Sequence, residues 1–155
     1  MSNFLSLRGG CQCGQVRYEI TKPPLTLYCC HCTQCQTQAA SAFGMSLRIS
    51  SDSLKFSGET SAFRRDAEKT TEVECVFCPY CGTRIFHRRN VTAANCSVKA
   101  GTLDDKSRLN PVGHIWVNSK QDWVILPTNA LTYETQPNDG YAALIEAYSL
   151  QQTKS

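Results

Sequence analysis

The residues most able to do chemistry in this chain are its ten cysteines, seven of which fall into three closely spaced groups. The groups are Cys11-x-Cys13, Cys30-x-Cys32-x-x-Cys35 and Cys78-x-x-Cys81. Two thiols one residue apart are too close along the chain for an ordinary disulfide with each other, but both can point at one metal ion. The spacing therefore favours metal binding over a disulfide scaffold.

The expected compartment agrees with this interpretation. The first residues, MSNFLSLRGG, lack the cationic start, the long apolar stretch and the small-residue cleavage site of a signal peptide. No apolar run approaches the length of a membrane span. We therefore expect a cytoplasmic protein, and in a reducing cytosol a high cysteine density points to metal binding or catalysis.

The clearest local motif is FCPYCGT, residues 77–83, in which Cys78 and Cys81 can bind one ion from a tight turn whose N–H groups donate to sulfur. Gly82 supplies permissive backbone after the second thiol, and Pro79 stiffens the turn. The alternative is a redox pair of the thioredoxin type, but that motif normally begins a long helix. Here residues 83–87 have a strand pattern, so the sequence favours metal.

A second pair of thiols, Cys11 and Cys13, lies in GGCQCGQVRYE between flanking glycines that allow a sharp backbone path. Two thiols here and two from Cys78 and Cys81 would make a closed tetrahedral site, which is the usual structural arrangement for zinc. Such a site would tie the N-terminal segment to the middle of the chain.

Three further thiols, Cys30, Cys32 and Cys35, fall within six residues of the stretch YCCHCTQC. Cys35 would lie about one helical turn beyond Cys32 and on the same side. Three protein ligands with one place open are typical of a catalytic or substrate-binding zinc site, and the open place can accept water or an exogenous thiolate.

The net charge gives little support to nucleic-acid binding. The formal charge is +3, but seven cysteine thiolates around two Zn²⁺ ions change it by about −7 + 4 = −3, to roughly zero. We therefore expect no nucleic-acid partner and no membrane partner. The sequence does not indicate an oligomeric state.

The elements that must position these groups are mostly short strands. We expect one domain over residues 1–150 and a polar tail over 151–155. Alternating or β-rich patterns predict strands at residues 15–20, 25–29, 46–50, 54–58, 71–77, 83–87, 93–100, 114–119 and 123–126. Two short helices are predicted at 32–42 and 141–150, with Asp139 as the cap of the second.

Residues 8–126 resemble the glutathione-dependent formaldehyde-activating enzyme family, also called the CENP-V/GFA domain family. The matching pieces, in family order, are GGCQCGQVRYE, CHCTQC, FCPYCGTRIF and HIWVNSKQDW. The resemblance implies the Mss4-like fold, a mostly β zinc-containing fold with short helices. It also implies two zinc ions per chain, a structural one on Cys11, Cys13, Cys78 and Cys81 and a second, where the reaction takes place, on Cys30, Cys32 and Cys35.

The activity implied by the resemblance is that of a carbon–sulfur lyase. The family's named reaction joins glutathione and formaldehyde into S-hydroxymethylglutathione or reverses that step. The expected partner is thus a small thiol such as glutathione, and the open zinc site, through Cys30, Cys32 and Cys35, would carry the catalysis. The alternative is a non-catalytic binding module whose seven cysteines serve architecture alone.

Several other residues have two interpretations. His31 could act as a ligand or proton shuttle, or it could face away from Cys30 and Cys32 in an extended segment. A clamp for the carboxylates of glutathione or another acidic thiol could be formed by Arg84, Arg88 and Arg89. The alternative is that these arginines form a solvated strand end. We expect structural roles for six further residues: His114, Trp116, Trp123, Cys29, Cys75 and Cys96. The alternative for His114, and for the loop that ends at Trp123, is a position at the border of the site.

Overall fold

The computed structural model describes residues 4–67 and 71–154, and in this part of the chain it contains eleven β-strands and two α-helices. The structure is mostly β, as predicted, and it is consistent with the Mss4-like fold. The chain divides into two compact units. Unit 1 comprises residues 1–24 and 48–108, and unit 2 comprises residues 25–47 and 109–155.

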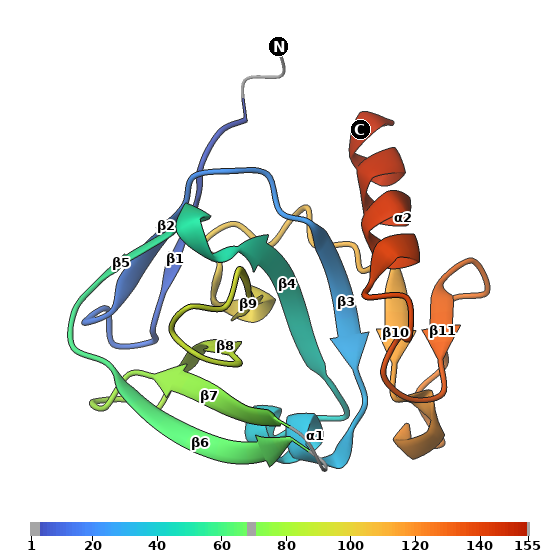
Figure 1. Ribbon diagram of the computed structural model, residues 1–155, viewed down its shortest axis with the longest axis horizontal. Coiled ribbons are helices and arrows are strands. Elements are labelled where there is room, and N and C mark those ends of the chain that lie inside the picture. Colours follow the sequence, from blue (N-terminus) through green and yellow to red (C-terminus); the bar gives the residue numbers. More distant parts are fainter. Residues whose placement is uncertain (1–3, 68–70, 155) are drawn as a thin grey trace. The chain divides into compact units, whose positions relative to one another are not determined.

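Unit 1 contains two antiparallel arrangements of strands (Figure 1). Strands β1 (Leu7–Gly10), β2 (Arg17–Ile20) and β5 (Leu54–Ser57) form a three-stranded sheet with β2 in the centre. The second arrangement has the order β9-β8-β7-β6, with these strands at Asn95–Lys99, Arg84–Arg88, Thr71–Phe77 and Ser61–Ala67. Val76, Ile85, Phe86 and Val98 contribute to the core. Burial does not alternate here, because the neighbours Ile85 and Phe86 are both buried and so are the last four residues of β9.

Unit 2 has strand β10 (Gly113–Ile115) at its centre, parallel both to β3 (Thr26–Cys30) and to β11 (Leu131–Tyr133). All five residues of β3 are buried, which explains why this segment has a continuous apolar pattern. Strand β4 (Gly44–Ser50) follows β3 in the sheet order; it begins in unit 2 and ends in unit 1.

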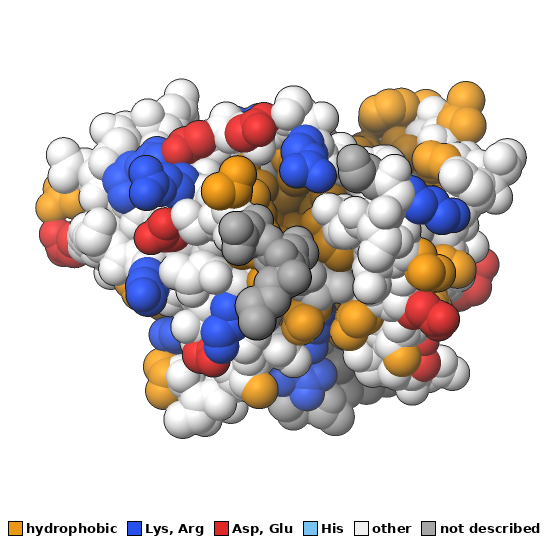
Figure 2. Space-filling view, turned by 90° about the horizontal axis from the view of Figure 1, so that it is seen from above, with side chains coloured by type: hydrophobic (Ala, Val, Ile, Leu, Met, Phe, Trp, Pro, Cys, Tyr) orange, Lys and Arg blue, Asp and Glu red, His pale blue; other side chains and the backbone are white. Residues whose placement is uncertain are grey.

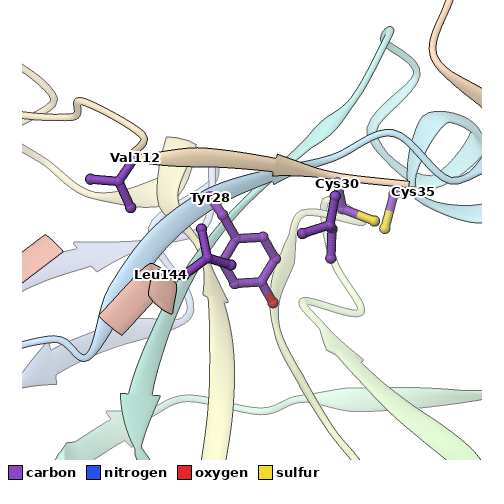
Figure 3. Packing of buried hydrophobic residues seen from close by; sticks show 6 residues of the cluster. Tyr28, Cys30, Cys35, Val112 and Leu144 are labelled. Carbon is purple, nitrogen blue, oxygen red and sulfur yellow. The ribbon is translucent and has the colours of Figure 1, made fainter. Parts of the chain in front are cut away.

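Two α-helices belong to unit 2, α1 (Thr33–Ala39) and α2 (Ala142–Thr153). Helix α2 lies beside β3 (Figure 1), where Thr26 Oγ1 donates to the Leu144 carbonyl over 2.9 Å. Leu144, Tyr28 and Val112 pack together in the core of this unit (Figure 3). Short 3₁₀ helices occur at Ser51–Ser53, Ala100–Thr102 and Val117–Ser119.

Most of the predicted elements are confirmed, with ends that differ from the predicted ones by at most three residues. Helix α1 ends at Ala39, three residues before the predicted end, and α2 continues through Thr153 into the segment predicted as a polar tail. Asp139 does act at the start of α2, because its carboxylate accepts the N–H groups of Tyr141 and Ala143, each over 3.0 Å.

The strand predicted at residues 123–126 is wrong. This segment is irregular, with Val124 buried and its neighbours Trp123 and Ile125 exposed. The strand predicted at 114–119 ends at Ile115, because Trp116 adopts a left-handed conformation with φ 58° and the next three residues form a 3₁₀ turn. Strands β1, β6 and β11 were not predicted; β1 contains two glycines, and the β6 residues Ala62, Phe63 and Arg64 are exposed.

The division into two units does not test the predicted single domain over residues 1–150, which stays a prediction. Among the described residues, no helix combines the length and the apolar character that crossing a membrane requires.

Candidate metal centres

The first candidate centre lies in unit 1 and brings together the four thiols predicted to share one ion. The sulfur atoms of Cys11, Cys13, Cys78 and Cys81 all lie within 4.8 Å of one another. The sulfur of Cys13 is 3.5 Å from that of Cys11 and 3.7 Å from that of Cys78. Four sulfurs at about 2.3 Å around a tetrahedral zinc are about 3.8 Å apart, so these spacings fit such an ion.

Two similar turns hold these thiols. In the first, Cys11 N donates to the Val16 carbonyl and Gly14 N donates to the Cys11 carbonyl. In the second, Cys78 N donates to the Thr83 carbonyl and Gly82 N donates to the Cys78 carbonyl over 2.9 Å. Each turn requires a left-handed residue directly after its second cysteine, and glycine occupies both positions, with φ 82° at Gly14 and 75° at Gly82.

The pKa values of the thiols in this centre show why a cation would stabilise their ionised forms. The Thr83 hydroxyl and N–H, together with the Cys13 N–H, lower the pKa of Cys81 to about 5. The Gln15 N–H favours the Cys13 thiolate, but burial and the other three thiols outweigh it and raise the pKa of Cys13 to about 12. Four thiolates this close would repel one another, so a divalent cation is what allows all four to ionise.

The redox interpretation of Cys78 and Cys81 receives no support from the backbone. The segment after Cys81 enters strand β8 at Arg84, whereas a thioredoxin-type pair begins a helix. All ten cysteines are free thiols. The four-thiol environment favours the metal interpretation.

The second candidate centre lies in unit 2, where the sulfur atoms of Cys30, Cys32 and Cys35 are within 4.8 Å of one another. Cys30 ends strand β3, Cys32 caps helix α1, and Cys35 lies in its first turns. The Cys32 sulfur accepts the N–H of Cys35 over 3.4 Å. Figure 3 shows the sulfurs of Cys30 and Cys35 beside each other at the edge of the apolar cluster around Tyr28.

Two thiols of this centre, Cys30 and Cys32, have raised pKa values. Hydrogen bonding with Cys32 and Cys35, followed by burial, raises the pKa of Cys30. Contact with Cys30 favours the Cys32 thiolate, but Cys35 and burial reverse this effect and leave the pKa of Cys32 raised. The chemistry of the donor set therefore fits a soft divalent cation such as zinc, which replaces the three protons. No His, Asp or Glu ligand atom among the described residues joins this cluster.

His31 is fully buried between the two cysteines of Cys30-x-Cys32, but its ring is not part of the thiol cluster. Its Nε2 lies 2.9 Å from Nδ1 of His114, and its ring packs at 5.2 Å from that of Phe43. Burial, assisted by His114 and Lys120, lowers the pKa of His31 to about 4, and burial also lowers the pKa of His114. Both rings are thus neutral near pH 7, so one donates to the other.

Gln36 is a contributor to this centre that the sequence did not reveal. Its side-chain amide donates to the carbonyl of His31 over 2.7 Å and to that of Ser119 over 2.9 Å. The Ser119 hydroxyl donates to the same His31 carbonyl over 3.0 Å. The backbone between Cys30 and Cys32 is therefore fixed by residues from α1 and from the loop after β10. The sequence does not distinguish Gln36 from Gln34 and Gln38 in the same helix, so nothing in it signals this role.

The arginines singled out in the sequence all lie in unit 1. Arg88 is half-buried and pairs through Nε with Oε2 of Glu74 at 2.6 Å, so a fully solvated strand end is the wrong description for it. Arg84 is also half-buried, whereas Arg89 is exposed. Side chains of both charges are interspersed on the face shown in Figure 2. The proposed clamp for substrate carboxylates stays a prediction.

The three cysteines outside the two centres, Cys29, Cys75 and Cys96, are buried, as expected of small core residues. Burial raises the pKa of Cys29 to about 12, which makes this thiol inert at neutral pH. Cys75 is fully buried on β7, and its thiol donates to the Val73 carbonyl over 3.6 Å. Although Cys75 is only three residues before Cys78, it therefore does not belong to the four-thiol centre.

Comparison with known proteins identifies a family and a similar fold. The family described as glutathione-dependent formaldehyde-activating enzyme matches residues 6–119. A crystal structure of a protein from Rhodobacter sphaeroides, a structural genomics target, is similar with a TM-score of 0.51 and 15% identity, over 81% of this chain and 98% of that one. The similarity to this crystal structure shows a shared fold. No curated protein matches the sequence.

Proposed function

The chain belongs to the family of glutathione-dependent formaldehyde-activating enzymes, and from this premise we propose that it is a zinc-dependent carbon–sulfur lyase. Its substrates would be a small thiol and a small aldehyde, with glutathione and formaldehyde giving S-hydroxymethylglutathione as the first pair to test. The observation that carries the proposal is the cluster of three thiols, Cys30, Cys32 and Cys35, which offers one ligand fewer than the closed four-thiol centre.

In the proposed arrangement, Cys30, Cys32 and Cys35 hold the zinc as thiolates. A zinc ion bound there supplies Lewis acidity and favours the deprotonated form of a substrate thiol. The chain fixes the ligand geometry by local means. Cys30 is held in the paired strand β3, and the Cys35 N–H orients the Cys32 sulfur. Gln36 restrains the carbonyl of His31, which lies between Cys30 and Cys32 in the chain.

The reaction is an addition with no change of oxidation state. The thiol sulfur forms a bond to the aldehyde carbon, and the carbonyl electron pair moves to the oxygen. The proton lost by the thiol ends on that oxygen, and the reverse reaction breaks the same carbon–sulfur bond. The apolar surroundings of Cys30 and Cys35 in unit 2, including Tyr28 and Ile115, limit the water that competes for this end of the site.

Exchange spectroscopy by NMR tests the proposal, because glutathione and formaldehyde also react without an enzyme. We expect the zinc-loaded protein to accelerate exchange between formaldehyde and S-hydroxymethylglutathione beyond the buffer rate. The Cys35→Ser variant should lose this acceleration, and Cys29→Ala, which changes a buried thiol outside both centres, should keep it. Exchange at the buffer rate with the unsubstituted protein would favour a non-catalytic zinc module instead.

A further inference from the structure

The loop that follows β10 holds a large aromatic side chain in water. Trp123 is 72% exposed, yet the loop that carries it is well fixed. The Lys120 ammonium donates to the carbonyls of Gln121 and Val124 over 3.1 and 2.9 Å, and Val124 N donates to the Gln121 carbonyl over 3.0 Å. The buried side chain of Val124 anchors the same loop. The exposure of Trp123 is therefore a feature of an ordered loop.

A chain of hydrogen bonds connects this indole to the three-thiol centre. Trp123 Nε1 donates to Oε1 of Gln121 over 2.6 Å, and Gln121 Nε2 donates to Oε1 of Gln36 over 3.1 Å. Gln36 in turn donates to the His31 carbonyl between Cys30 and Cys32. All of these residues belong to unit 2. Three successive hydrogen bonds thus fix the position of the indole relative to the backbone that carries the thiols.

The two tryptophans of the chain are used differently. Trp116 is half-buried, packs against the apolar cluster that includes Cys30 and Cys35, and donates its N–H to Gln136 over 3.3 Å. Trp123 satisfies its N–H within the loop and leaves most of its ring surface in water. Tryptophan is enriched at binding surfaces, where its ring packs against the partner while its N–H keeps a hydrogen bond, so an exposed and oriented indole is suited to contact a ligand.

We propose that Trp123 is a substrate-binding residue that receives the planar amide groups of a peptide thiol whose sulfur lies at Cys30, Cys32 and Cys35. The inference rests on the proposed function and adds a subsite to it. A peptide thiol such as glutathione has amide planes that can stack on an indole, whereas 2-mercaptoethanol has only a thiol and a hydroxyl. The subsite therefore distinguishes peptide thiols from simple ones.

Calorimetric titration of the zinc-loaded protein with both thiols tests this subsite. Trp123→Ala should weaken glutathione by roughly three- to tenfold, the range expected for one aromatic contact. The same variant should leave the affinity for 2-mercaptoethanol unchanged. Ile125→Ala is the matched control, because Ile125 is 91% exposed on the same loop, and it should change neither affinity.

Fluorescence gives an independent readout, since the chain has two tryptophans. In a Trp116→Phe background, glutathione should change the emission of Trp123, and 2-mercaptoethanol should change it far less. Unchanged glutathione affinity in Trp123→Ala, or an equal loss for both thiols, would overturn the subsite and leave the proposed function intact. If neither thiol binds the unsubstituted protein, both proposals are wrong.

Discussion

At the scale of single residues, the ten thiols differ through their neighbours rather than through their position in the sequence. Cys81 is acidic because Thr83 donates to it, and Cys29 is inert because it is buried among apolar groups. Cysteine spacing predicted which thiols come together, because two ligands on one turn need only local geometry. The contact with Thr83 could not be predicted, since a threonine after a turn has many other uses.

Thr83 offers a direct test of the four-thiol centre. Its oxygen accepts the Gln12 N–H over 3.2 Å, so its hydroxyl hydrogen is available to the Cys81 sulfur, 3.2 Å away. Thr83→Val removes this donor, and we expect the affinity for zinc at this centre to fall by roughly tenfold or more. Competition with a chromophoric chelator measures the change. Thr83→Ser, which keeps the hydroxyl, is the control, and equal affinity in the Val and Ser variants would contradict the prediction.

At the scale of elements, helix α1 shows what the sequence could and could not predict. Its start was predictable, because the segment after Cys32 is rich in glutamine and alanine, which have good helix propensity. Its end was not, because the residue that stops it is an ordinary alanine. Ala40 adopts a left-handed conformation with φ 48°, and its N–H bonds to the carbonyls of Gln36 and Thr37. The helix therefore has only seven residues.

The unusual end of α1 predicts a stabilising substitution. Glycine adopts the left-handed region without the cost that a Cβ adds, so Ala40→Gly should increase the free energy of unfolding by about 0.5–1 kcal/mol. Ala39→Gly is the control, since Ala39 is exposed but helical, and it should lower that free energy by about 1 kcal/mol. Urea denaturation of the zinc-loaded variants measures both. The prediction is wrong if Ala40→Gly destabilises the protein as much as Ala39→Gly does.

The strands were predictable where alternation or a buried run is strong, as in β2 and β3. The error at residues 123–126 has a physical cause. The apolar run WVIL resembles a strand, but Val124 is its one buried residue. The Val124 carbonyl accepts the Lys120 ammonium and the Val124 N–H donates to the Gln121 carbonyl, so neither group is left for a neighbouring strand. A sequence pattern cannot show that a lysine will cap a loop in this way.

At the scale of the whole molecule, each unit contains one cluster of thiols within the described residues, with four thiols in unit 1 and three in unit 2. Cys13 and Cys78 meet although 65 residues separate them, and this pairing was predicted by counting ligands for a closed site. The pair His31–His114 and the pair Gln36–Gln121 are separated by 83 and 85 residues and were not predicted. A single imidazole or amide has no spacing rule that would reveal its partner.

The difference in ligand number predicts unequal retention of metal. We expect two zinc ions per chain, with the ion at Cys30, Cys32 and Cys35 lost first during graded chelation, because a site with an exchangeable fourth ligand opens more easily than a closed one. Metal analysis after each chelator step measures this order. A single tightly held zinc in protein purified under reducing, zinc-replete conditions would be incompatible with two sites.

The same difference separates folding from chemistry. Cys78→Ser should unfold or severely destabilise the protein, since metal binding at a closed structural site is part of the folding free energy. Cys35→Ser should retain more of the fold but lose thiol binding. Thermal melts of the two variants measure the contrast. Equal collapse of both would indicate two structural zinc ions and favour the non-catalytic module.

The central claim is that a substrate thiol binds through its sulfur at the centre formed by Cys30, Cys32 and Cys35, and calorimetry with glutathione and its S-methyl derivative tests it most directly. The S-methyl compound has no ionisable thiol, so it should bind much more weakly than glutathione. The affinity for glutathione should rise with pH while its thiol, with a pKa of about 8.5, loses its proton, and then level off. Equal affinity for the two compounds would contradict sulfur ligation, and with it the account of this site.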